Sequence, residues 1–347
     1  QGLSVLSHVL FLLPFLYPPH LSLLVFLLIF NTYRILCLRT KCNPVSCTFL
    51  YHFCTIIHLT EFLTCASLLI KQIDFLRKKG FSRHILSSMK ADKEALTRNG
   101  QRIGGREQLL AGDHFRVRLL ETVDSDGIVP VSMPLSILYE DEDILVINKP
   151  ADMPVHPSIG NYTNTLANGV AAYLDAKDEH SPFRCINRLD RDTSGALILA
   201  KNAFSAAVLS TQMRNRQIRR TYLAVVEGIT PPNGTISAPI SRVDDSVIER
   251  HVDFLRGEPA VTHYERLEVK NEHSLLEIHL ETGRTHQIRV HMGYIGHPLP
   301  ADYLYHPVYD CFKRQPLHSL QLEFRHPVTD KPMCLLAPVS EDMCNAF

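Results

Sequence analysis

Hydrophobic and polar positions alternate in short runs from about residue 133 onward, and they predict strands there. Residues 137–148 indicate two strands around an acidic turn, and Pro150 ends the second because proline has no N–H to give to a sheet ladder. Residues 196–200 are all apolar, which is typical of a buried strand. The preceding segment, residues 182–195, carries five charged residues. A charged loop between buried strands is therefore expected to hold Asp190 in a fixed, sheltered position.

A second informative segment follows further along the chain. Residues 275–281 alternate between apolar and polar side chains as a strand does, and a helix is expected over 286–292. Thr285 stands at the N-cap position, where its hydroxyl would accept a hydrogen bond from a free amide of the first turn. Arg289 lies four residues into the predicted helix, so its side chain can point back toward a carboxylate.

The segment after residue 70 has a finer pattern. Apolar positions at helical spacing predict a helix over 73–80 that ends on a glycine, and Ser82 is expected to cap a second helix over 83–89. Asn99-Gly100 is a hairpin signal, and residues 115–119 alternate as a strand does. We expect two short helices packed on a small sheet.

Charge is balanced overall but unevenly distributed. Lys and Arg number 36 and so do Asp and Glu, yet residues 71–118 hold twelve basic and five acidic residues. This asymmetry suggests that the basic part, which we delimit as residues 71–125, contacts nucleic acid. The candidate phosphate contacts are its basic side chains Arg77, Lys78, Lys79, Arg83, Lys90 and Arg98.

Residues 1–70 differ in composition from the rest. Only four of them are charged, and residues 9–30 reach the length of a membrane span only if three prolines and a histidine are included. No basic region precedes the apolar run, as a signal peptide requires. Since the sequence begins with Gln and its first Met is Met89, we expect residues 1–70 to come from a misplaced start or translated upstream sequence, not from a native folded domain. A membrane anchor is the alternative.

The 347 residues allow two or three domains. The cysteines indicate the cellular compartment in which the protein works. Nine cysteines are present, without a Cys-x-x-Cys pair or the Cys/His spacing of a structural zinc site. We therefore expect a reduced, cytoplasmic protein.

Asp190 can be compared with several known chemistries. The run that it begins matches the start of a calcium EF-hand loop, but Lys201 occupies the twelfth position, where a bidentate Glu is required. Calcium is thus excluded. An aspartate can also accept a phosphoryl group, so Asp190 as acceptor with Asp192 as acid stays open. No nucleotide-binding glycine motif occurs nearby, and His286 and His291 lack the spacing of paired zinc ligands on a helix.

Several further segments occur in one order along the chain: Asp143-Ile-Leu-Val-Ile-Asn-Lys-Pro150, Pro154-Val-His-Pro157, Arg188-Leu-Asp-Arg-Asp-Thr-Ser-Gly195, Arg220-Thr-Tyr-Leu-Ala-Val-Val-Glu-Gly228, Ala260-Val-Thr-His-Tyr264, Thr282-Gly-Arg-Thr-His-Gln-Ile-Arg-Val-His291 and Phe324-Arg-His-Pro327. Together they resemble the RluA-type RNA pseudouridine synthases. Phe75-Leu-Arg-Lys-Lys-Gly-Phe-Ser-Arg83 and Gly112-Asp-His-Phe-Arg-Val117 are similar to an S-four-like RNA-binding module.

The resemblance implies an α+β fold with a mixed, mostly antiparallel central sheet in residues 133–340, and an isomerase that converts uridine in RNA to pseudouridine. Asp190 is then the nucleophile, and Arg289 is the guanidinium that orients it. Tyr222 matches the tyrosine that packs on the uracil and takes its proton. The target base must be flipped out, and Arg188 fills its place or holds the phosphate. The implied partner is ribosomal or transfer RNA, without metal, cofactor or membrane, and we expect a monomer.

The sequence also departs from the family pattern. Asn187 stands where a His is usual, and Asp152 and Ala301 stand where glycines are usual. These departures motivate an alternative hypothesis, an RNA-binding protein that has lost catalysis.

The remaining polar residues of these segments are expected to support the fold. Lys149 and His156 are interpreted as scaffold or RNA-surface residues, and His318 and His326 as structural. We assign Asp192 to support of the loop that carries Asp190.

Overall fold

The computed structural model of this protein describes residues 55–57, 70–104, 107–110, 112–119, 127–179 and 181–347. The expectations for residues 1–70 therefore lie outside the described residues, apart from 55–57 and 70. Within the described ranges, no helix combines the length and the hydropathy that crossing a bilayer requires.

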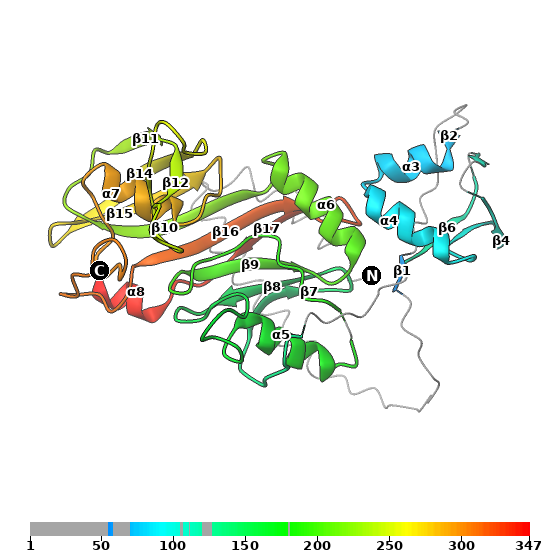
Figure 1. The fold of residues 1–347 in the computed structure, drawn as a ribbon, viewed down its shortest axis with the longest axis horizontal. Helices are drawn as coiled ribbons and strands as arrows, with labels where there is room; N and C mark the ends of the chain where they lie inside the picture. Colours follow the sequence, from blue (N-terminus) through cyan, green and yellow to red (C-terminus); the bar gives the residue numbers. More distant parts are fainter. Residues whose placement is uncertain (1–54, 58–69, 105–106, 111, 120–126, 180) are drawn as a thin grey trace, which may run out of the picture. The chain divides into compact units, whose positions relative to one another are not determined.

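The part of the chain that the structure describes consists mainly of strands, which follow one another in runs with a few short helices between them (Figure 1). The helices that the structure describes are α3 (Gln72–Lys78), α4 (Arg83–Ser88), the 3-10 turn η3 (Met89–Ala91), α5 (Leu166–Asp175), α6 (Ala203–Arg214), α7 (Gln287–Tyr294) and α8 (Glu341–Ala346). The strands are β1 (Thr55–Ile57), β2 (Ile70–Lys71), β3 (Leu96–Arg98), β4 (Gln101–Arg102), β5 (Gln108–Leu109), β6 (Phe115–Leu119), β7 (Ser136–Glu140), β8 (Ile144–Lys149), β9 (Ser194–Ala200), β10 (Arg219–Glu227), β11 (Asn233–Ser237), β12 (Ile240–Arg242), β13 (Arg250–Val252), β14 (Val261–Lys270), β15 (His273–Leu280), β16 (Leu317–Arg325) and β17 (Pro332–Leu336).

Residues 70–119 contain the expected two short helices and small sheet. Ser82 caps α4, since its hydroxyl oxygen accepts a hydrogen bond from the Ile85 N–H at 3.3 Å. Asn99 and Gly100 adopt φ angles of 52° and 80°, as a tight turn between β3 and β4 requires. The sheet order is β1-β6-β3-β4, and the apolar residues of β6 are buried while those between them are more exposed. The local patterns of this segment are thus confirmed.

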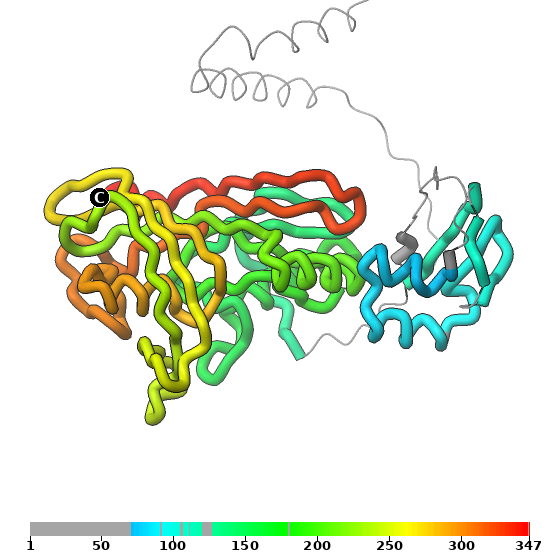
Figure 2. Tube along the Cα trace, turned by 90° about the horizontal axis from the view of Figure 1, so that it is seen from above, coloured from blue at the N-terminus to red at the C-terminus, as the bar shows by residue number. Residues whose placement is uncertain are grey.

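A nine-stranded sheet forms the larger part of the fold (Figure 1). Its order is β11-β14-β15-β10-β16-β9-β8-β7, and β17 pairs with β16. Figure 2 shows β16 and β17 side by side at the red end of the colour scale. The pairs are antiparallel except β16 and β9, which run parallel. The sheet is therefore mixed and mostly antiparallel, and the α+β fold class is confirmed.

Strands β8 and β9 are buried on both faces because a helix covers each face. Leu145, Ile147, Leu197 and Leu199 pack in one apolar cluster with residues of α5. The residues that alternate with them pack in another cluster with residues of α6. This double covering explains why residues 196–200 are a continuous apolar run and do not alternate.

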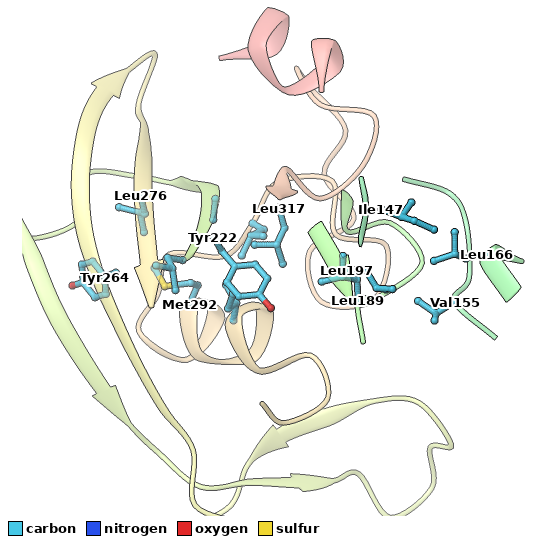
Figure 3. Close-up of a cluster of buried hydrophobic side chains, with 14 of the residues drawn as sticks. Ile147, Val155, Leu166, Leu189, Leu197, Tyr222, Tyr264, Leu276, Met292 and Leu317 are labelled. Carbon is cyan, nitrogen blue, oxygen red and sulfur yellow. The ribbon is translucent and has the colours of Figure 1, made fainter. Parts of the chain in front are cut away.

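The larger of these clusters continues across the sheet (Figure 3). It includes Tyr264 of β14, Leu276 of β15 and Met292 of α7, and Figure 3 shows Tyr222 of β10 in its middle. Leu189 belongs to the same cluster. One core therefore fixes the loop next to Leu189, strand β10 and helix α7 relative to one another.

The start of β9 approaches β16 very closely. Ser194 pairs with His318 and Gly195 with Ser319, in parallel register. Gly195 has a φ of 112°, and a Cβ there would lie 2.3 Å from the carbonyl oxygen of Ser319. Only glycine fits this position. The loop that carries Asp190 is thereby anchored against the centre of the sheet.

The helix expected over 286–292 begins one residue later, and the predicted N-cap is wrong. The N-cap residue of α7 is His286, in a left-handed conformation with a φ of 58° and without a side-chain cap bond. The Oε1 of Gln287 accepts a hydrogen bond from the Arg284 N–H at 3.0 Å, in the turn that precedes the helix.

Candidate active site

Asp190 lies at a hollow of about 1070 Å³. Tyr222 of β10 and His286, the residue before α7, also line it. The Asp190 side chain is 26% exposed and reaches the hollow, whereas the adjacent Leu189 is buried in the core. The Thr193 N–H donates to the Asp190 carbonyl at 3.2 Å and closes the loop. The expected fixed and sheltered position is confirmed.

Arg289 of α7 places its guanidinium beside Asp190. Its Nη1 donates to Asp190 Oδ2 at 3.0 Å, and its Nε and Nη2 donate to the two carboxylate oxygens of Asp302 at 2.7 Å each. The Arg289 side chain is only 1% exposed. Burial alone would lower the pKa of Arg289, but the hydrogen bonds to Asp302 and the charges of both aspartates outweigh it and raise that pKa. The guanidinium is therefore permanently charged.

The guanidinium of Arg289 lies over the rings of two tyrosines. Its Cζ lies 5.5 Å from the ring centroid of Tyr303 and 4.9 Å from that of Tyr305. Cation–π contacts of this kind are stronger where water is excluded. The bonds to Asp302 and the contacts with the two rings together fix the direction of the guanidinium group that meets Asp190.

Tyr222 lies where the register of β10 and β16 shifts, between Thr221 and Tyr222. Such irregularities re-aim side chains next to functional sites. Its ring is buried in the core and also lines the hollow. Burial raises the pKa of Tyr222, so the hydroxyl keeps its proton at neutral pH.

Lys149 is fully buried, so an RNA-surface role for it is wrong and the scaffold role is confirmed. Its Nζ donates to the carbonyl oxygens of Pro150, Met153 and Arg191 at 2.7, 2.8 and 2.9 Å. These bonds join the end of β8 to the residue after Asp190. Burial lowers the pKa of Lys149 to about 7, although the nearby carboxylates, chiefly Asp190, oppose this effect. His156, by contrast, is exposed and lines the hollow.

The rim of the hollow is rich in arginine. Six arginines line it: Arg188, Arg214, Arg216, Arg220, Arg250 and Arg284. Two acids, Asp190 and Glu281, line it as well. Arg188 is exposed, and its guanidinium has no ion pair with any residue that the structure describes. This surface suits a polyanion.

The departures from the family pattern have local explanations. Asn187 is buried, donates from Nδ2 to the Ala196 carbonyl at 3.2 Å and accepts from the Ile198 N–H at 2.9 Å, so it ties the loop to β9. Asp152 and Ala301 adopt φ angles of 54° and 53°, the left-handed region that favours glycine. The pair formed by Asp190 and Arg289 is present together with all three replacements.

The basic residues proposed for phosphate contact in residues 71–125 lie on α3, α4 and the positions beside them. Arg77, Lys78 and Arg83 are exposed, and Arg77 pairs with Asp74 at 3.4 Å. Lys79 is half-buried, with Nζ 5.7 Å from the ring centroid of Phe75. None of the four, Arg77, Lys78, Lys79 and Arg83, is among the residues that line the hollow.

Asp141, Asp143 and His326 have ligand atoms within 4.8 Å of one another, the spacing of a metal site. Both carboxylate oxygens of Asp141 are already engaged, however. Asp141 Oδ1 accepts from the backbone N–H groups of Asp143 and Ile144, and Oδ2 accepts from Tyr139 and from His326, all at 2.8 to 2.9 Å. The cluster fixes the turn between β7 and β8, which confirms the structural role expected for His326.

Sequence reasoning gave no role to three side chains around the pair of Asp190 and Arg289, namely His286, Asp302 and Tyr305. His286 Nε2 lies 3.9 Å from Asp190 Oδ1, and its Nδ1 lies 2.8 Å from the Tyr305 hydroxyl. Asp302 anchors Arg289, thirteen residues earlier in the chain. All three stand within or near segments that carry the resemblance, but no local period shows that they converge.

Comparisons with known proteins agree with this geometry. A family model described as RNA pseudouridylate synthase matches residues 143–294. The uncharacterized RNA pseudouridine synthase YjbO of Bacillus subtilis is 39% identical over 265 residues, which cover 76% of this chain and 93% of that protein. Ribosomal large subunit pseudouridine synthase D of Neisseria meningitidis is 38% identical over 250 residues, 69% of this chain and 67% of that protein.

A solved structure, human RNA Pseudouridylate Synthase Domain Containing 1, is 29% identical with a TM-score of 0.50 and covers 59% of this chain and 83% of that one. The similarity of sequence and fold and the carboxylate paired with a buried guanidinium lead to one conclusion. The chain belongs to the RNA pseudouridine synthase family, the isomerases that act on uridine in RNA.

Proposed function

We propose that this protein converts uridine to pseudouridine in large-subunit ribosomal RNA, with Asp190 as the nucleophile. The observation that carries the proposal is the bond of 3.0 Å between the buried Arg289 and Asp190, at the edge of a basic hollow. Relatives named ribosomal large subunit pseudouridine synthase D match 69 to 76% of this chain, which supports ribosomal over transfer RNA as the substrate.

The reaction demands a carboxylate in this place. As the bond between C1′ of the ribose and N1 of the uracil breaks, its electron pair leaves with the uracil and positive charge develops at C1′. Asp190 attacks this carbon and forms a C1′–O bond, as carboxylates do in retaining glycosidases. C5 of the rotated uracil then attacks C1′, the C1′–O bond breaks, and the carboxylate is regenerated. Arg289 keeps Asp190 ionised and oriented throughout.

Tyr222 acts on the uracil ring in two ways, by packing against it and by carrying a proton. Its aromatic face packs against the uracil and excludes water, which would otherwise trap the ribose after the base has left. The isomerisation also moves one proton from C5 to N1, and Tyr222 is the proposed carrier. Because burial keeps its hydroxyl protonated at rest, the phenol must give up one proton for each proton that it accepts.

Arg188 assists the step in which the target uridine leaves its stack and enters the hollow. A base inside a stacked helix cannot reach Asp190, and flipping it out costs about a few kcal/mol of stacking. Arg188 is exposed at the hollow, two residues before the nucleophile, so its side chain can occupy the vacated space or hold the adjacent phosphate.

The segment over residues 71–125 extends the RNA contact as an S-four-like module. Its support is the pair of helices with Arg77, Lys78 and Arg83 exposed. The cysteines of the described residues are free thiols, which supports the cytoplasm as the compartment.

The test is Asp190→Asn, assayed on a transcript of large-subunit ribosomal RNA. Pseudouridine is detected by reverse-transcription stops after carbodiimide treatment. We expect turnover by the wild type and a loss of at least about 10³-fold in the variant, with the dissociation constant for RNA unchanged within about threefold. A wild type that binds the RNA without turnover would instead establish the inactive RNA-binding alternative. Mapping pseudouridine in cells with and without the gene identifies the uridine.

A further inference from the structure

His286 occupies a position in the hollow that no step above uses. Its Nε2 lies 3.9 Å from Asp190 Oδ1, on the carboxylate oxygen that Arg289 does not hold. The side chain is 10% exposed, so it borders the space that a nucleotide would fill. A substrate atom placed over Asp190 is therefore also within reach of His286.

The backbone of His286 supports a functional interpretation. Its φ of 58° is in the left-handed region, which residues other than glycine adopt uncommonly, although asparagine, aspartate and histidine do so more often than the rest. Residues kept in such conformations cluster at active sites, where the surrounding structure enforces them. At this position the conformation ends the turn after β15 and starts α7, while the imidazole stays at the edge of the hollow.

Hydrogen bonds indicate which ring nitrogen carries the proton. The Tyr305 hydroxyl oxygen already accepts from the Arg250 N–H at 3.0 Å, so we assign the hydroxyl as the donor to His286 Nδ1, which lies 2.8 Å away. Burial raises the pKa of Tyr305 to about 12, so this hydrogen is present at neutral pH. Burial also lowers the pKa of His286, so the ring is neutral. The proton of the neutral ring is then on Nε2, the nitrogen nearer Asp190.

We propose that His286 is a further catalytic residue, whose Nε2–H donates a hydrogen bond to an oxygen of the uracil while the base is detached from the ribose. The inference rests on the proposed function. When the C1′–N1 bond breaks, the electron pair that leaves with the uracil spreads over its carbonyl oxygens. A fixed donor aimed at such developing charge accelerates a reaction. No proton leaves His286, and the bond is released when C5 attaches to C1′.

Two substitutions separate this role from a merely structural one. Asn adopts left-handed φ angles readily, and its amide reaches only the position of Nδ1, so His286→Asn keeps the backbone and loses the donor. Gln places an N–H close to the position of Nε2, so His286→Gln keeps the donor. A structural role predicts that His286→Asn is the more active of the two, and the proposed role predicts the reverse.

The experiment measures kcat and KM on the ribosomal transcript for the wild type, both variants and His279→Asn, a control on the exposed part of β15. We expect a loss of about 10²- to 10³-fold in kcat for His286→Asn, with KM within threefold, and a loss below about tenfold for His286→Gln. The control is expected to match the wild type. Full activity of His286→Asn, or an equal loss in both variants, would overturn the proposal.

A second variant keeps the proposal testable if His286→Asn does not fold. Tyr305→Phe leaves His286 in place but removes the hydroxyl that fixes its tautomer, and we expect kcat to fall about three- to tenfold with KM unchanged. Unchanged kcat would contradict the proposal. If the wild type itself does not turn over the transcript, the proposed function has failed. If the wild type is active and Asp190→Asn is not, the proposed function holds, and the His286 variants then test the role of His286 alone.

Discussion

Asp302 holds Arg289 through Nε and Nη2, at 2.7 Å each, and this leaves Nη1 of Arg289 for Asp190 at 3.0 Å. The guanidinium is thus shared between a buried carboxylate that only orients it and an accessible carboxylate that faces the hollow. Asp302 also accepts hydrogen bonds at Oδ1 from the N–H groups of Leu304 and Tyr305, so the loop that carries it is itself fixed. The direction of Arg289 is therefore set before any substrate arrives.

The first prediction concerns this arrangement. Asp302→Asn keeps one carbonyl oxygen for the loop but places an amide NH₂ against the guanidinium. We expect kcat to fall about 10- to 100-fold with KM within threefold, because Asp190 loses the fixed orientation of its partner. Asp302→Ala should cost about 3–5 kcal/mol of unfolding free energy, because it leaves Nε and Nη2 of the buried guanidinium without the carboxylate that they bind. Single-turnover assays and urea denaturation measure the two effects. An Asp302→Asn enzyme with wild-type kcat would show that orientation of Arg289 is unimportant.

The second prediction separates packing from proton transfer at Tyr222. Tyr222→Phe keeps the ring and removes the hydroxyl, so unfolding free energy should change by less than about 1.5 kcal/mol. If the hydroxyl carries the proton from C5, kcat should fall about 10²- to 10⁴-fold. Tyr222→Leu, which also removes the stacking face, should be at least as slow and should in addition bind RNA more weakly. A Tyr222→Phe enzyme within threefold of wild type would limit Tyr222 to packing.

Local patterns predicted most of the fold that positions the site. The strand at residues 196–200, the capped helix after Ser82 and the turn at Asn99-Gly100 depend on neighbours in sequence, and the structure has them as expected. The N-cap at Thr285 was wrong because α7 begins one residue later, after His286, whose left-handed backbone has no signal in the hydrophobic pattern. A capping residue is thus predictable only where the pattern fixes the first helical residue to within one position.

Sequence motifs predicted some residues of the site and missed others. Asp190, Arg289 and Tyr222 follow from resemblance, and the structure brings them together. Asp302 and His286 were missed as partners because their roles depend on the path of a loop and on a left-handed residue. Lys149 was left undecided between surface and scaffold, because only the fold shows that three carbonyl oxygens surround its ammonium.

The third prediction concerns the two left-handed positions that differ from the family. The Asp152 side chain is 92% exposed, so Asp152→Gly relieves backbone strain and loses little else. We expect a gain of about 0.5–1 kcal/mol in unfolding free energy. Ala301 is buried beside Val225 and Phe312, so Ala301→Gly also loses a methyl worth about 0.8 kcal/mol, and the net change should be near zero. Urea denaturation measures the unfolding free energy of both variants against the wild type. Equal gains would mean that the methyl of Ala301 contributes nothing.

The last prediction is a loss of stability between about pH 7 and pH 5. Burial lowers the pKa values of His286, His291 and His318 below their usual value of 6.5. The unfolded chain therefore binds more protons than the folded chain as the pH falls through 6.5, and the free energy of unfolding becomes smaller as the pH falls. Each histidine contributes at most about 1.4 kcal/mol per pH unit.

His318 offers the direct check of this pH dependence. Its Nε2 donates to the Ala337 carbonyl at 3.2 Å, and its Nδ1 accepts from the Ser194 hydroxyl at 2.9 Å, so the folded chain holds it neutral. His318→Gln keeps a donor for the carbonyl but cannot titrate. Urea denaturation at pH 8 should show the variant less stable than the wild type by about 1–2 kcal/mol, the range for a lost buried hydrogen bond. That difference should shrink toward pH 5, because only the wild type loses the contribution of a neutral histidine. Parallel stability curves over this range would show that His318 does not take part in the acid sensitivity.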